Sequence, residues 1–485
     1  MKADFKRSYY LTTTLPYVND RPHVGHTLEF VQADVIARAK RLLGYDVFLN
    51  FGTDEHGQKI YKKALESGKS PQAYVDEYAA TFGALKEALN FSYDKFIRTT
   101  DPEHKTAAQE FWKICAKKGD IYKKFYKIKY CVGCELEKTD SELVGGKCPL
   151  HTNLEVEILD EENYFFRFSK YENALKELYQ ERLDFVLPAF RLNEIKSLIE
   201  GEGLQDFSIS RLKEKMPWGI PVPDDESHVI YVWFDALINY ISTIGWPKDM
   251  TKFKKYWPVT QFAGKDQVRQ QAAMWQAMLF SAGLQPSKQI IIHGFIVGDG
   301  GIKMSKSLGN VIDPYKVVEE YGTDALRYFL LRHIHPFEDS EFTMPKFKEA
   351  YNAHLANGLG NLVSRIMKMS SDYDVAANLP NHEEVLDNEL STAVFDNLEK
   401  YDYNAALDLI WSEIQNLDSY VNIKEPFKLI KHNPEEARKA VATLVKGLWN
   451  LAIVLEPFLP ATALEIQRLI GSNSVPGKPL FLRKE

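Results

Sequence analysis

The first fifty residues alternate between strand and helix patterns, and this alternation restricts the possible folds more than any other feature of the chain. Residues 9–14 and 45–51 are short runs of β-branched, aromatic and aliphatic side chains, which are typical of buried strands. Residues 21–43 repeat apolar side chains at helical spacing and stop before Gly44, a suitable helix C-cap. A strand–helix–strand order of this kind predicts an α/β fold with a doubly wound parallel sheet of the Rossmann type.

The same pattern returns in the second half of the chain. A helix is expected over residues 267–283, where apolar side chains recur at helical spacing. Short apolar runs predict three further strands, over 229–234, 258–263 and 289–297. Between the two α/β stretches lies a long segment of mixed elements that holds all but one of the cysteines. We therefore expect an insertion that divides the sheet domain into two halves.

Strand patterns stop after residue 345. Amphipathic helical patterns follow, and they predict long helices over 347–369, 403–421 and 434–455. The tail after Ser472 carries proline and glycine and is expected to be poorly ordered. The expected domains are the two halves of the sheet domain at 1–118 and 216–310, the insertion at 119–215, a linking region at 311–345 and a helical bundle at 346–485.

Size and composition narrow the class of protein. A chain of 485 residues is too long for one compact core. Its formal net charge of −7 does not favour a nucleic-acid binder, although a local basic surface can serve that purpose. The longest apolar run, around residues 448–459, is interrupted by polar residues and Pro457, and residues 1–10 lack the apolar segment of a secretory signal. We expect a cytoplasmic protein without membrane segments.

Three of the four cysteines cluster with one histidine and suggest a metal site. Cys131 and Cys134 form one Cys-x2-Cys pair, and Cys148 and His151 form a Cys-x2-His pair. Paired ligands at this spacing are typical of tetrahedral zinc. Three cysteines and one histidine leave no open coordination position, so we expect one structural zinc ion per chain. The alternative is a set of free thiols.

Two motifs suit a nucleotide triphosphate. The loop after the first strand contains Pro22, His23, Gly25 and His26 and opens a helix, whose free N–H groups and dipole favour phosphate. Two imidazoles there could stabilise charge on a transferring phosphate. Far downstream, residues 303–307 read Lys-Met-Ser-Lys-Ser after a glycine-rich stretch. Lysines on a mobile loop suit a pyrophosphate leaving group.

These two motifs, in this order, resemble those of class I aminoacyl-tRNA synthetases. Further stretches are similar to the methionyl-tRNA synthetase family, namely Leu15-Pro16-Tyr17, residues 52–57 (Gly-Thr-Asp-Glu-His-Gly), residues 233–236 (Trp-Phe-Asp-Ala), Gly264-Lys265-Asp266 and His293-Gly294. The resemblance covers nearly the whole chain. It implies a methionine–tRNA ligase that forms methionyl-adenylate from methionine and ATP with Mg²⁺, and then charges initiator and elongator methionine tRNA.

The resemblance also implies roles for individual residues. It assigns the methionine site to Leu15, Tyr17, Asp54, Arg211, Trp233, Leu237, Tyr240 and His293, with Asp54 on the ammonium group and Arg211 as the partner of Asp54. It assigns ATP binding to Pro16, His23, Gly25, His26, Glu29, Gly264, Asp266, Lys303, Ser305 and Lys306, of which His23, His26, Lys303 and Lys306 are catalytic. Aromatic rings suit a thioether, and tyrosine O–H or histidine N–H groups can donate weakly to its sulfur.

The helical bundle resembles the anticodon-binding domain of the same family. Asn361 and Arg365 are four residues apart on one helical face, and the family reads anticodon bases from these positions. The third position is usually tryptophan in the family, and here it is Phe427, which still offers a stacking face but could equally be a core residue. The chain lacks the dimerising module that many relatives carry after the bundle, so we expect a monomer.

The chain departs from the family pattern at a few positions. Gln270 and Gln271 stand where a Phe-His pair is usual, and Gln276 and Leu237 stand where proline is common. These departures affect the shape of the pocket rather than the reaction.

Two other classes of protein share part of this pattern. Another class I ligase is the nearest, but the aliphatic ligases need an editing insertion for which this chain has too little room, and a cysteine ligase needs an open zinc site. A zinc-containing nucleic-acid-binding protein would explain the cysteines and the bundle but not the two nucleotide motifs.

Overall fold

A six-stranded parallel sheet forms the centre of the N-terminal domain in this computed structural model, which describes residues 7–134, 136–138, 140–201, 203–302, 304 and 310–485. The strand order is β3-β2-β1-β12-β13-β7. The strands are β1 (Ser8–Thr12), β2 (Asp46–Thr53), β3 (Lys95–Arg98), β7 (Val186–Leu187), β12 (Thr260–Gly264) and β13 (Gln289–His293). All pairings are parallel, which confirms the predicted doubly wound fold. The order reverses between β1 and β12, where such sheets bind ligands.

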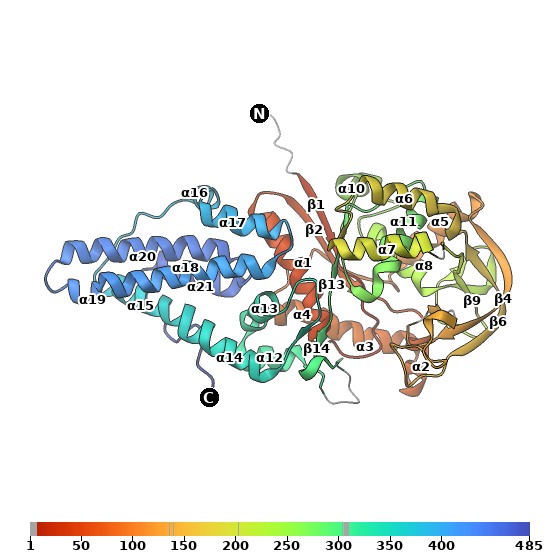
Figure 1. Cartoon of the computed structure of the whole chain (residues 1–485), viewed down its shortest axis with the longest axis horizontal. Coiled ribbons are helices and arrows are strands. Elements are labelled where there is room, and N and C mark those ends of the chain that lie inside the picture. Colours follow the sequence, from red (N-terminus) through yellow and green to blue (C-terminus); the bar gives the residue numbers. More distant parts are fainter. Residues whose placement is uncertain (1–6, 135, 139, 202, 303, 305–309) are drawn as a thin grey trace.

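The strands are nearly continuous apolar runs because helices cover both faces of the sheet. Helix α1 (Val24–Leu42) connects β1 to β2 and is buried along most of its length. It begins three residues later than the start expected at residue 21, because His23 is the N-cap and Pro22 precedes the helix. Figure 1 shows α1 at the junction between the sheet domain and the bundle. The other described α-helices before residue 300 are α2 (Gln58–Glu66), α3 (Pro71–Gly83), α4 (Leu85–Leu89), α5 (Pro102–Lys117), α6 (Glu172–Glu181), α7 (Ala189–Gly201), α8 (Val232–Ala236), α9 (Asn239–Ser242), α10 (Met250–Tyr256) and α11 (Trp275–Ser281), and a π-helical stretch (Gln270–Met274) leads into α11.

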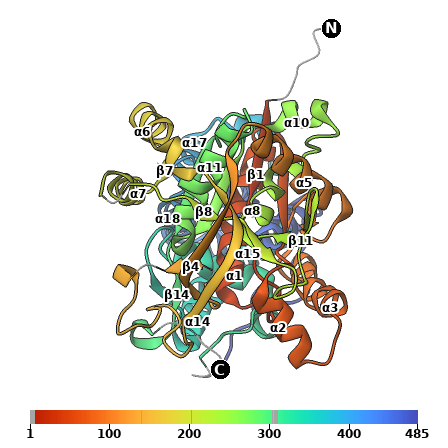
Figure 2. The same cartoon turned by 90° about the vertical axis from the view of Figure 1, so that its right-hand side faces the viewer.

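Two antiparallel sheets form the end of the molecule that faces away from the bundle (Figures 1 and 2). One has the order β5-β4-β6-β8 and the other β10-β11-β9. Their strands are β4 (Ile121–Cys131), β5 (Leu136–Lys138), β6 (Glu157–Phe166), β8 (Phe207–Ser208), β9 (Ser210–Leu212), β10 (Pro221–Val222) and β11 (Asp225–Ile230). Strand β7 comes from the same stretch of sequence but lies at the edge of the parallel sheet.

The strand expected over residues 229–234 is wrong. Strand β11 ends at Ile230, and residues Val232–Ala236 form helix α8. Side chains from Val229 to Tyr240 are almost all buried, so the segment reads as a continuous apolar run. Such a run has no periodicity that separates a buried strand from a buried helix.

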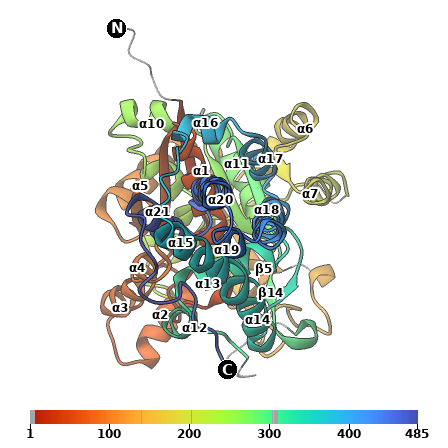
Figure 3. The same ribbon diagram turned by 90° about the vertical axis from the view of Figure 1, so that its left-hand side faces the viewer.

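The C-terminal region is helical, as predicted, and Figure 3 shows α15, α18, α20 and α21 grouped side by side. Helix α20 (Pro434–Leu455) has the predicted bounds, and α18 (Tyr403–Lys424) is slightly longer than expected. The remaining elements after residue 295 are β14 (Ile296–Val297), α12 (Pro314–Tyr321), α13 (Thr323–Arg332), β15 (Ser340–Glu341), α14 (Met344–Ala350), a π-helical stretch (Tyr351–Gly360), α15 (Asn361–Asp372), α16 (His382–Leu386), α17 (Glu389–Leu398), α19 (Pro426–Leu429) and α21 (Pro460–Gly471). No described helix is both long enough and apolar enough to cross a membrane.

The tail after Ser472 is ordered, which corrects the expectation. Phe481 is buried in the apolar core of the bundle, beside Tyr351. The Tyr351 hydroxyl donates to the carbonyl of Leu482 (2.9 Å), and Asn352 exchanges two hydrogen bonds with the backbone of Lys484. The composition of the tail did not reveal these contacts because they depend on a distant helix.

A fully buried arginine ties the sheet domain to the bundle. Arg327 of α13 forms an ion pair with Asp34 of α1 at 2.8 Å. Its guanidinium also donates to the carbonyls of Pro457 and Phe458, which follow α20, and of Leu89 at the end of α4. Burial raises the pKa of Asp34, but Arg327, Arg38 and two hydrogen bonds from Ser92 outweigh it and hold the pKa below its ordinary value. Asp34 is therefore ionised and paired.

Candidate active site

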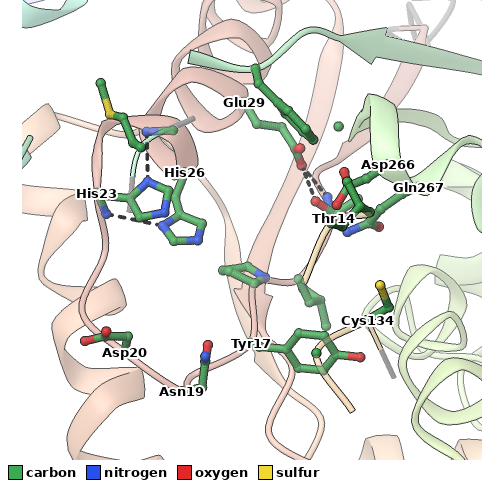
Figure 4. Close-up of a pocket in the computed structure, with 18 of the residues that line it drawn as sticks. Thr14, Tyr17, Asn19, Asp20, His23, His26, Glu29, Cys134, Asp266 and Gln267 are labelled. Carbon is green, nitrogen blue, oxygen red and sulfur yellow. Dashed lines mark hydrogen bonds between the residues drawn. The ribbon is translucent and has the colours of Figure 1, made fainter. Parts of the chain in front are cut away.

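A cavity of about 680 Å³ opens beside the carboxyl ends of β1 and β12. Eleven of the residues predicted for methionine and ATP line it, namely Leu15, Pro16, Tyr17, His23, Gly25, His26, Glu29, Trp233, Gly264, Asp266 and His293. Asp54, Arg211, Leu237 and Tyr240 are buried but are not among the lining residues. Lys303, Ser305 and Lys306 lie outside the described residues. Figure 4 shows part of this cavity, with the two histidines on one side and Glu29, Thr14 and Asp266 on the other.

The two histidines begin helix α1 with a reciprocal cap. The Nδ1 atom of His23 accepts from the N–H of Gly25 (3.1 Å), and Nδ1 of His26 accepts from the N–H of His23 (3.2 Å). The rings stack with centroids 3.9 Å apart, as Figure 4 shows. Gly25 is required here because a Cβ atom at this position would lie 2.8 Å from the His23 ring. The loop sequence therefore fixes both rings at the mouth of the helix.

The cap also fixes the protonation of the two rings. Because each Nδ1 accepts a backbone hydrogen bond, a neutral ring must carry its hydrogen on Nε2. Burial, reinforced by the neighbouring His23, holds the pKa of His26 well below its ordinary value, so His26 is neutral at pH 7. The Nε2–H of His26 is therefore a hydrogen-bond donor, positioned by the helix N-terminus beside the cavity.

Glu29 links three parts of the cavity wall. Its Oε1 accepts from the backbone N–H (2.5 Å) and the hydroxyl (2.7 Å) of Thr14, and its Oε2 lies 2.8 Å from Nε2 of His293. The other ring nitrogen of His293 lies 2.7 Å from the carbonyl of Gly294. Burial lowers the pKa of His293, but Glu29 and Gly294 outweigh it and raise the pKa above its ordinary value. Both ring nitrogens are engaged, so His293 presents a ring face rather than a free N–H to a substrate.

The His293–Glu29 pair makes stability depend on pH. The pKa of His293 is higher in the folded chain than the value of about 6.5 expected when unfolded. The stabilisation is therefore complete below about pH 6.5 and is lost as the pH rises through the higher folded-state value. The melting-temperature gap between wild type and His293→Gln should narrow as the pH is raised from about 6 to about 9.

The matched control is Glu29→Gln. This variant also disturbs the two hydrogen bonds from Thr14, whose donors do not titrate in this range. Part of its melting-temperature difference from wild type should therefore persist at high pH. A melting-temperature difference between wild type and His293→Gln that does not change with pH would contradict the pairing of a protonated His293 with Glu29.

Two of the three aromatic residues predicted for methionine are in contact. The rings of Tyr17 and Trp233 meet edge to face with centroids 6.3 Å apart. The Tyr240 ring meets Trp275 in the same way, and its hydroxyl accepts a hydrogen bond from Nε2 of Gln271 (2.8 Å). Leu237 is 2% exposed and packs in the same apolar core as Tyr240.

Asp54 and Arg211 approach this region from different elements. Asp54 follows β2, and its backbone pairs with Pro16 and Val18, so it is fixed beside the loop that lines the cavity. The guanidinium of Arg211 donates to the Ser208 hydroxyl and the Ser210 carbonyl, each at 2.7 Å, and lies 4.0 Å from the centroid of the Tyr231 ring.

The sequence reading missed a buried acid with two histidine partners. Oδ2 of Asp235 lies 2.6 Å from Nδ1 of His56, and Oδ1 lies 2.7 Å from Nε2 of His104. All three side chains are at most 2% exposed. Asp235 follows Trp233 by two residues and His56 follows Asp54 by two, so the contact joins two walls of the expected methionine site. Asp235 and His56 both lie in the family-like stretches, but no sequence signal pointed to their contact.

Two glutamines also line the cavity. Gln267 and Gln270 follow Asp266, and Gln270 occupies one of the positions where the chain departs from the family pattern. The Oε1 atom of Gln270 is buried and has no hydrogen-bond partner among the described residues. The wall is therefore more polar here than the Phe-His pair would make it.

The cysteine cluster is brought together as predicted. The Sγ atom of Cys134 lies 3.5 Å from Sγ of Cys148 and 3.2 Å from Nδ1 of His151, while Cys131 and Cys148 lie 3.8 and 3.9 Å from the same nitrogen. A tetrahedral zinc ion brings its sulfur and nitrogen ligands to about 3.5–3.8 Å from one another. The four side chains therefore fit a zinc ion.

The segments that carry these four ligands, together called the knuckle, form part of the cavity wall. Gly133, Cys134, Leu150 and His151 all line the cavity. A Cβ atom at Gly133 would lie 2.4 Å from the His151 ring, so only glycine allows the loop to close over the ligand cluster. The metal site and the cavity thus share side chains.

The predicted anticodon residues lie on the bundle, far from the cavity in sequence. Asn361 is exposed at the start of α15. Arg365 forms an ion pair with Asp418 of α18 at 2.6 Å and also donates to Asn422. Phe427 is 43% exposed, which excludes the alternative that it is a core residue.

Comparisons with known proteins agree with this geometry. Residues 9–156 and 151–367 match the family model of tRNA synthetases class I (M), and residues 387–481 match the anticodon-binding domain of tRNA ligases. The chain is 40% identical over 482 residues to the methionine–tRNA ligase of a Nostoc species, covering 96% of this chain and 90% of that protein. It is 40% identical over 484 residues to the ligase of Thermotoga maritima, covering 97% of this chain and 76% of that protein.

A solved structure is also similar. It is the methionyl-tRNA synthetase of Mycobacterium tuberculosis in complex with methionyl-adenylate, with a TM-score of 0.89 and 36% identity, covering 98% of this chain and 95% of that one.

Proposed function

This chain belongs to the methionyl-tRNA synthetase family of class I tRNA synthetases, and we propose how its residues divide the work of the reaction. The chain is a methionine–tRNA ligase: it activates L-methionine with ATP and transfers the methionyl group to the 3′ end of methionine tRNA. The observation that carries the proposal is the pair of capped histidines at the switch point of the sheet, beside a cavity lined by aromatic residues.

Methionine occupies the part of the cavity near Trp233. Leu15, Tyr17, Trp233, Leu237 and Tyr240 surround its side chain, and the ring face of His293 adds to the wall. Asp54 binds the ammonium group, and Arg211 supports Asp54. The contact of Asp235 with His56 and His104 supports this arrangement because it holds the residues beside Trp233 and Asp54 together.

ATP occupies the part of the cavity near the start of α1. Asp266 accepts from the ribose hydroxyls, with Pro16, Gly25, Glu29 and Gly264 forming the surrounding wall. His23 and His26 lie beside the phosphates. Lys303, Ser305 and Lys306 belong to the same site by family resemblance and lie outside the described residues. A Mg²⁺ ion bound with ATP offsets charge on the phosphates.

In the first step, a carboxylate oxygen of methionine attacks the α-phosphorus of ATP in line. A new oxygen–phosphorus bond forms, the bond to the β-phosphate bridging oxygen breaks, and pyrophosphate leaves with that electron pair. The Nε2–H groups of His23 and His26 donate to the phosphate oxygens as charge moves toward the leaving group. In the second step, a terminal ribose hydroxyl of tRNA attacks the adenylate carbonyl and releases AMP. No bond to the protein is needed.

ATP–pyrophosphate exchange with each of the twenty amino acids tests this assignment. Exchange confined to methionine is the expected result. Exchange with another aliphatic amino acid would keep the fold and overturn the methionine pocket, and absence of exchange with all twenty would overturn the catalytic assignment.

One zinc ion bound by Cys131, Cys134, Cys148 and His151 folds the knuckle, which has little apolar core of its own. Because the knuckle forms part of the cavity wall, loss of zinc should reduce pyrophosphate exchange by about 10- to 100-fold, the range typical when supports of a metal site are lost. Zinc content by mass spectrometry and the exchange rate should fall together on chelation and recover on addition of Zn²⁺. Full exchange by zinc-free protein would contradict this role.

The bundle binds the anticodon of methionine tRNA through Asn361, Arg365 and Phe427. The exposed ring of Phe427 supports base stacking, and the contact of Arg365 with Asp418 holds its guanidinium in place. The functional division follows the parts 1–118, 119–215, 216–310, 311–345 and 346–485. We expect a monomer in the cytoplasm, and light scattering that detects a stable dimer at micromolar concentration would refute the monomer.

A further inference from the structure

The short loop that carries Asp54 is held in place by contacts from several other elements. This loop, residues 54–57, joins β2 to α2, and all four of its residues are buried. It has no regular secondary structure of its own, so its position depends on the groups that bind its backbone and side chains. A carboxylate on such a loop can meet a substrate group at the right distance and angle only if these anchors hold.

Glu55 provides the first anchor of the loop. Its carboxylate accepts from Nε and NH2 of Arg98 (2.6 and 2.9 Å) and from the hydroxyl of Thr53 (2.7 Å). Its backbone carbonyl accepts from the indole N–H of Trp218, which precedes β10, at 2.6 Å. The residue that follows Asp54 is therefore fixed both through its side chain and through its backbone.

His56 provides the second anchor and connects Asp54 to helix α8. Its backbone N–H lies 3.5 Å from Oδ1 of Asp54, and its Nδ1 lies 2.6 Å from Oδ2 of Asp235. Burial raises the pKa of Asp235, but His56 and His104 outweigh it and hold the pKa below its ordinary value. Asp235 is therefore an ionised acceptor, and Nδ1 of His56 carries the hydrogen of a charge-assisted bond.

His104 binds the same carboxylate from a different side. Its Nε2 lies 2.7 Å from Oδ1 of Asp235, and its Nδ1 lies 3.0 Å from the hydroxyl of Ser242 in α9. Both histidines are at most 2% exposed and approach Asp235 to nearly the same distance. They differ in location, because His104 belongs to α5 and His56 belongs to the loop of Asp54. The two contacts can therefore be compared directly.

We propose that His56 is a positioning residue for the ammonium group of the substrate, in that its bond to Asp235 holds the 54–57 loop and so fixes the Asp54 carboxylate. The inference rests on the proposed contact of Asp54 with that ammonium group. A hydrogen bond between charged groups is strong but weakens steeply when its distance and angle change. Loss of the His56 anchor therefore acts on the ammonium group more than on the rest of the substrate.

The test compares two competitive inhibitors of ATP–pyrophosphate exchange that differ only in the amino group. L-Methioninol carries the ammonium group, and methylthiobutanol is the same molecule without it. The ratio of their Ki values measures what the ammonium group contributes to binding. His56→Leu should lower this ratio about tenfold, as expected when a charge-assisted hydrogen bond is weakened. His56→Asn can still place an N–H where Nδ1 stands, so its ratio should remain near that of wild type.

His104→Leu is the matched control. It removes one donor from the same buried carboxylate, so it should lower the melting temperature about as much as His56→Leu does. Its ratio of Ki values should equal that of wild type, because the loop of Asp54 keeps its bond to Asp235. A purely structural role of the Asp235 cluster would instead change the two histidine variants alike.

A second variant covers the case in which His56→Leu does not fold, as judged by its melting temperature. Trp218→Phe removes the donor to the Glu55 carbonyl and leaves Asp235 with both partners, so it should lower the same ratio by a smaller factor. An unchanged ratio in folded His56→Leu or in Trp218→Phe, or an equal fall in His104→Leu, would overturn the proposal. Wild-type enzyme that binds both inhibitors equally tightly would instead overturn the proposed contact of Asp54 with the ammonium group.

Discussion

Replacement of His26 by alanine should slow methionine-dependent pyrophosphate exchange by about 10²–10³-fold, the loss typical for one preorganised donor at a developing charge. The ring is neutral, so it contributes a directed Nε2–H rather than a full charge. The KM for methionine should change little because His26 lies on the phosphate side of the cavity. The rate of ATP–pyrophosphate exchange and the KM for methionine measure the two effects.

The same substitution removes half of the helix cap. Its loss should lower stability by about 1 kcal/mol, the usual contribution of a helix cap. His26→Asn separates the two roles, because its side-chain oxygen can still accept from the backbone of His23 but carries no donor at the position of Nε2. The asparagine variant should regain melting temperature and remain slow. If it regains the exchange rate as well, His26 acts only through the helix.

Replacement of Arg327 by leucine should lower the free energy of unfolding by about 3–5 kcal/mol, the range for removing one partner of a buried ion pair. It leaves the Asp34 carboxylate buried with only Arg38 and Ser92 as partners, and three backbone carbonyls lose their donor. Chemical denaturation measures the loss.

Arg38→Leu is the matched control. Arg38 pairs with the same carboxylate but is partly exposed, so its loss should be smaller, about 1 kcal/mol or less. An Arg327→Leu variant as stable as Arg38→Leu would show that the buried pair contributes little.

The sequence predicted elements well where the periodic pattern and the end signals agree. Helix α20 is an example: Asn433 caps it, Pro434 is its first residue and its apolar side chains face one direction. The strand predicted over residues 229–234 was wrong because burial on all sides of this segment removes the periodicity that separates a strand from a helix. The prediction of a poorly ordered tail was wrong because Phe481 packs against a helical segment more than a hundred residues earlier in the chain.

The predictions for the site divide in the same way, into those that depend on local sequence and those that depend on the fold. The placement of His23, Gly25 and His26 at the start of one helix was predicted from the sequence because the geometry of a short motif is local. The partners of Asp235 and the hydrogen bonds of Gln271 with Gln261 and Tyr240 could not be predicted, since they join residues that only the fold brings together. Gln271 and Gln276 stand out in the sequence as departures from the family pattern, but the hydrogen bond between them does not.

One apolar core runs without interruption from α1 through α13 into the bundle, so we expect these parts of the enzyme to unfold as a single cooperative unit. The RNA-reading end is therefore not a detachable module. A fragment that stops before the bundle would present the inner sides of α1 and α13 to water, and heating the whole chain should melt α1, α13 and the bundle together. Recombination that exchanges the bundle between relatives would therefore give a stable protein only if the bundle and the helices α1 and α13 that pack against it came from the same parent.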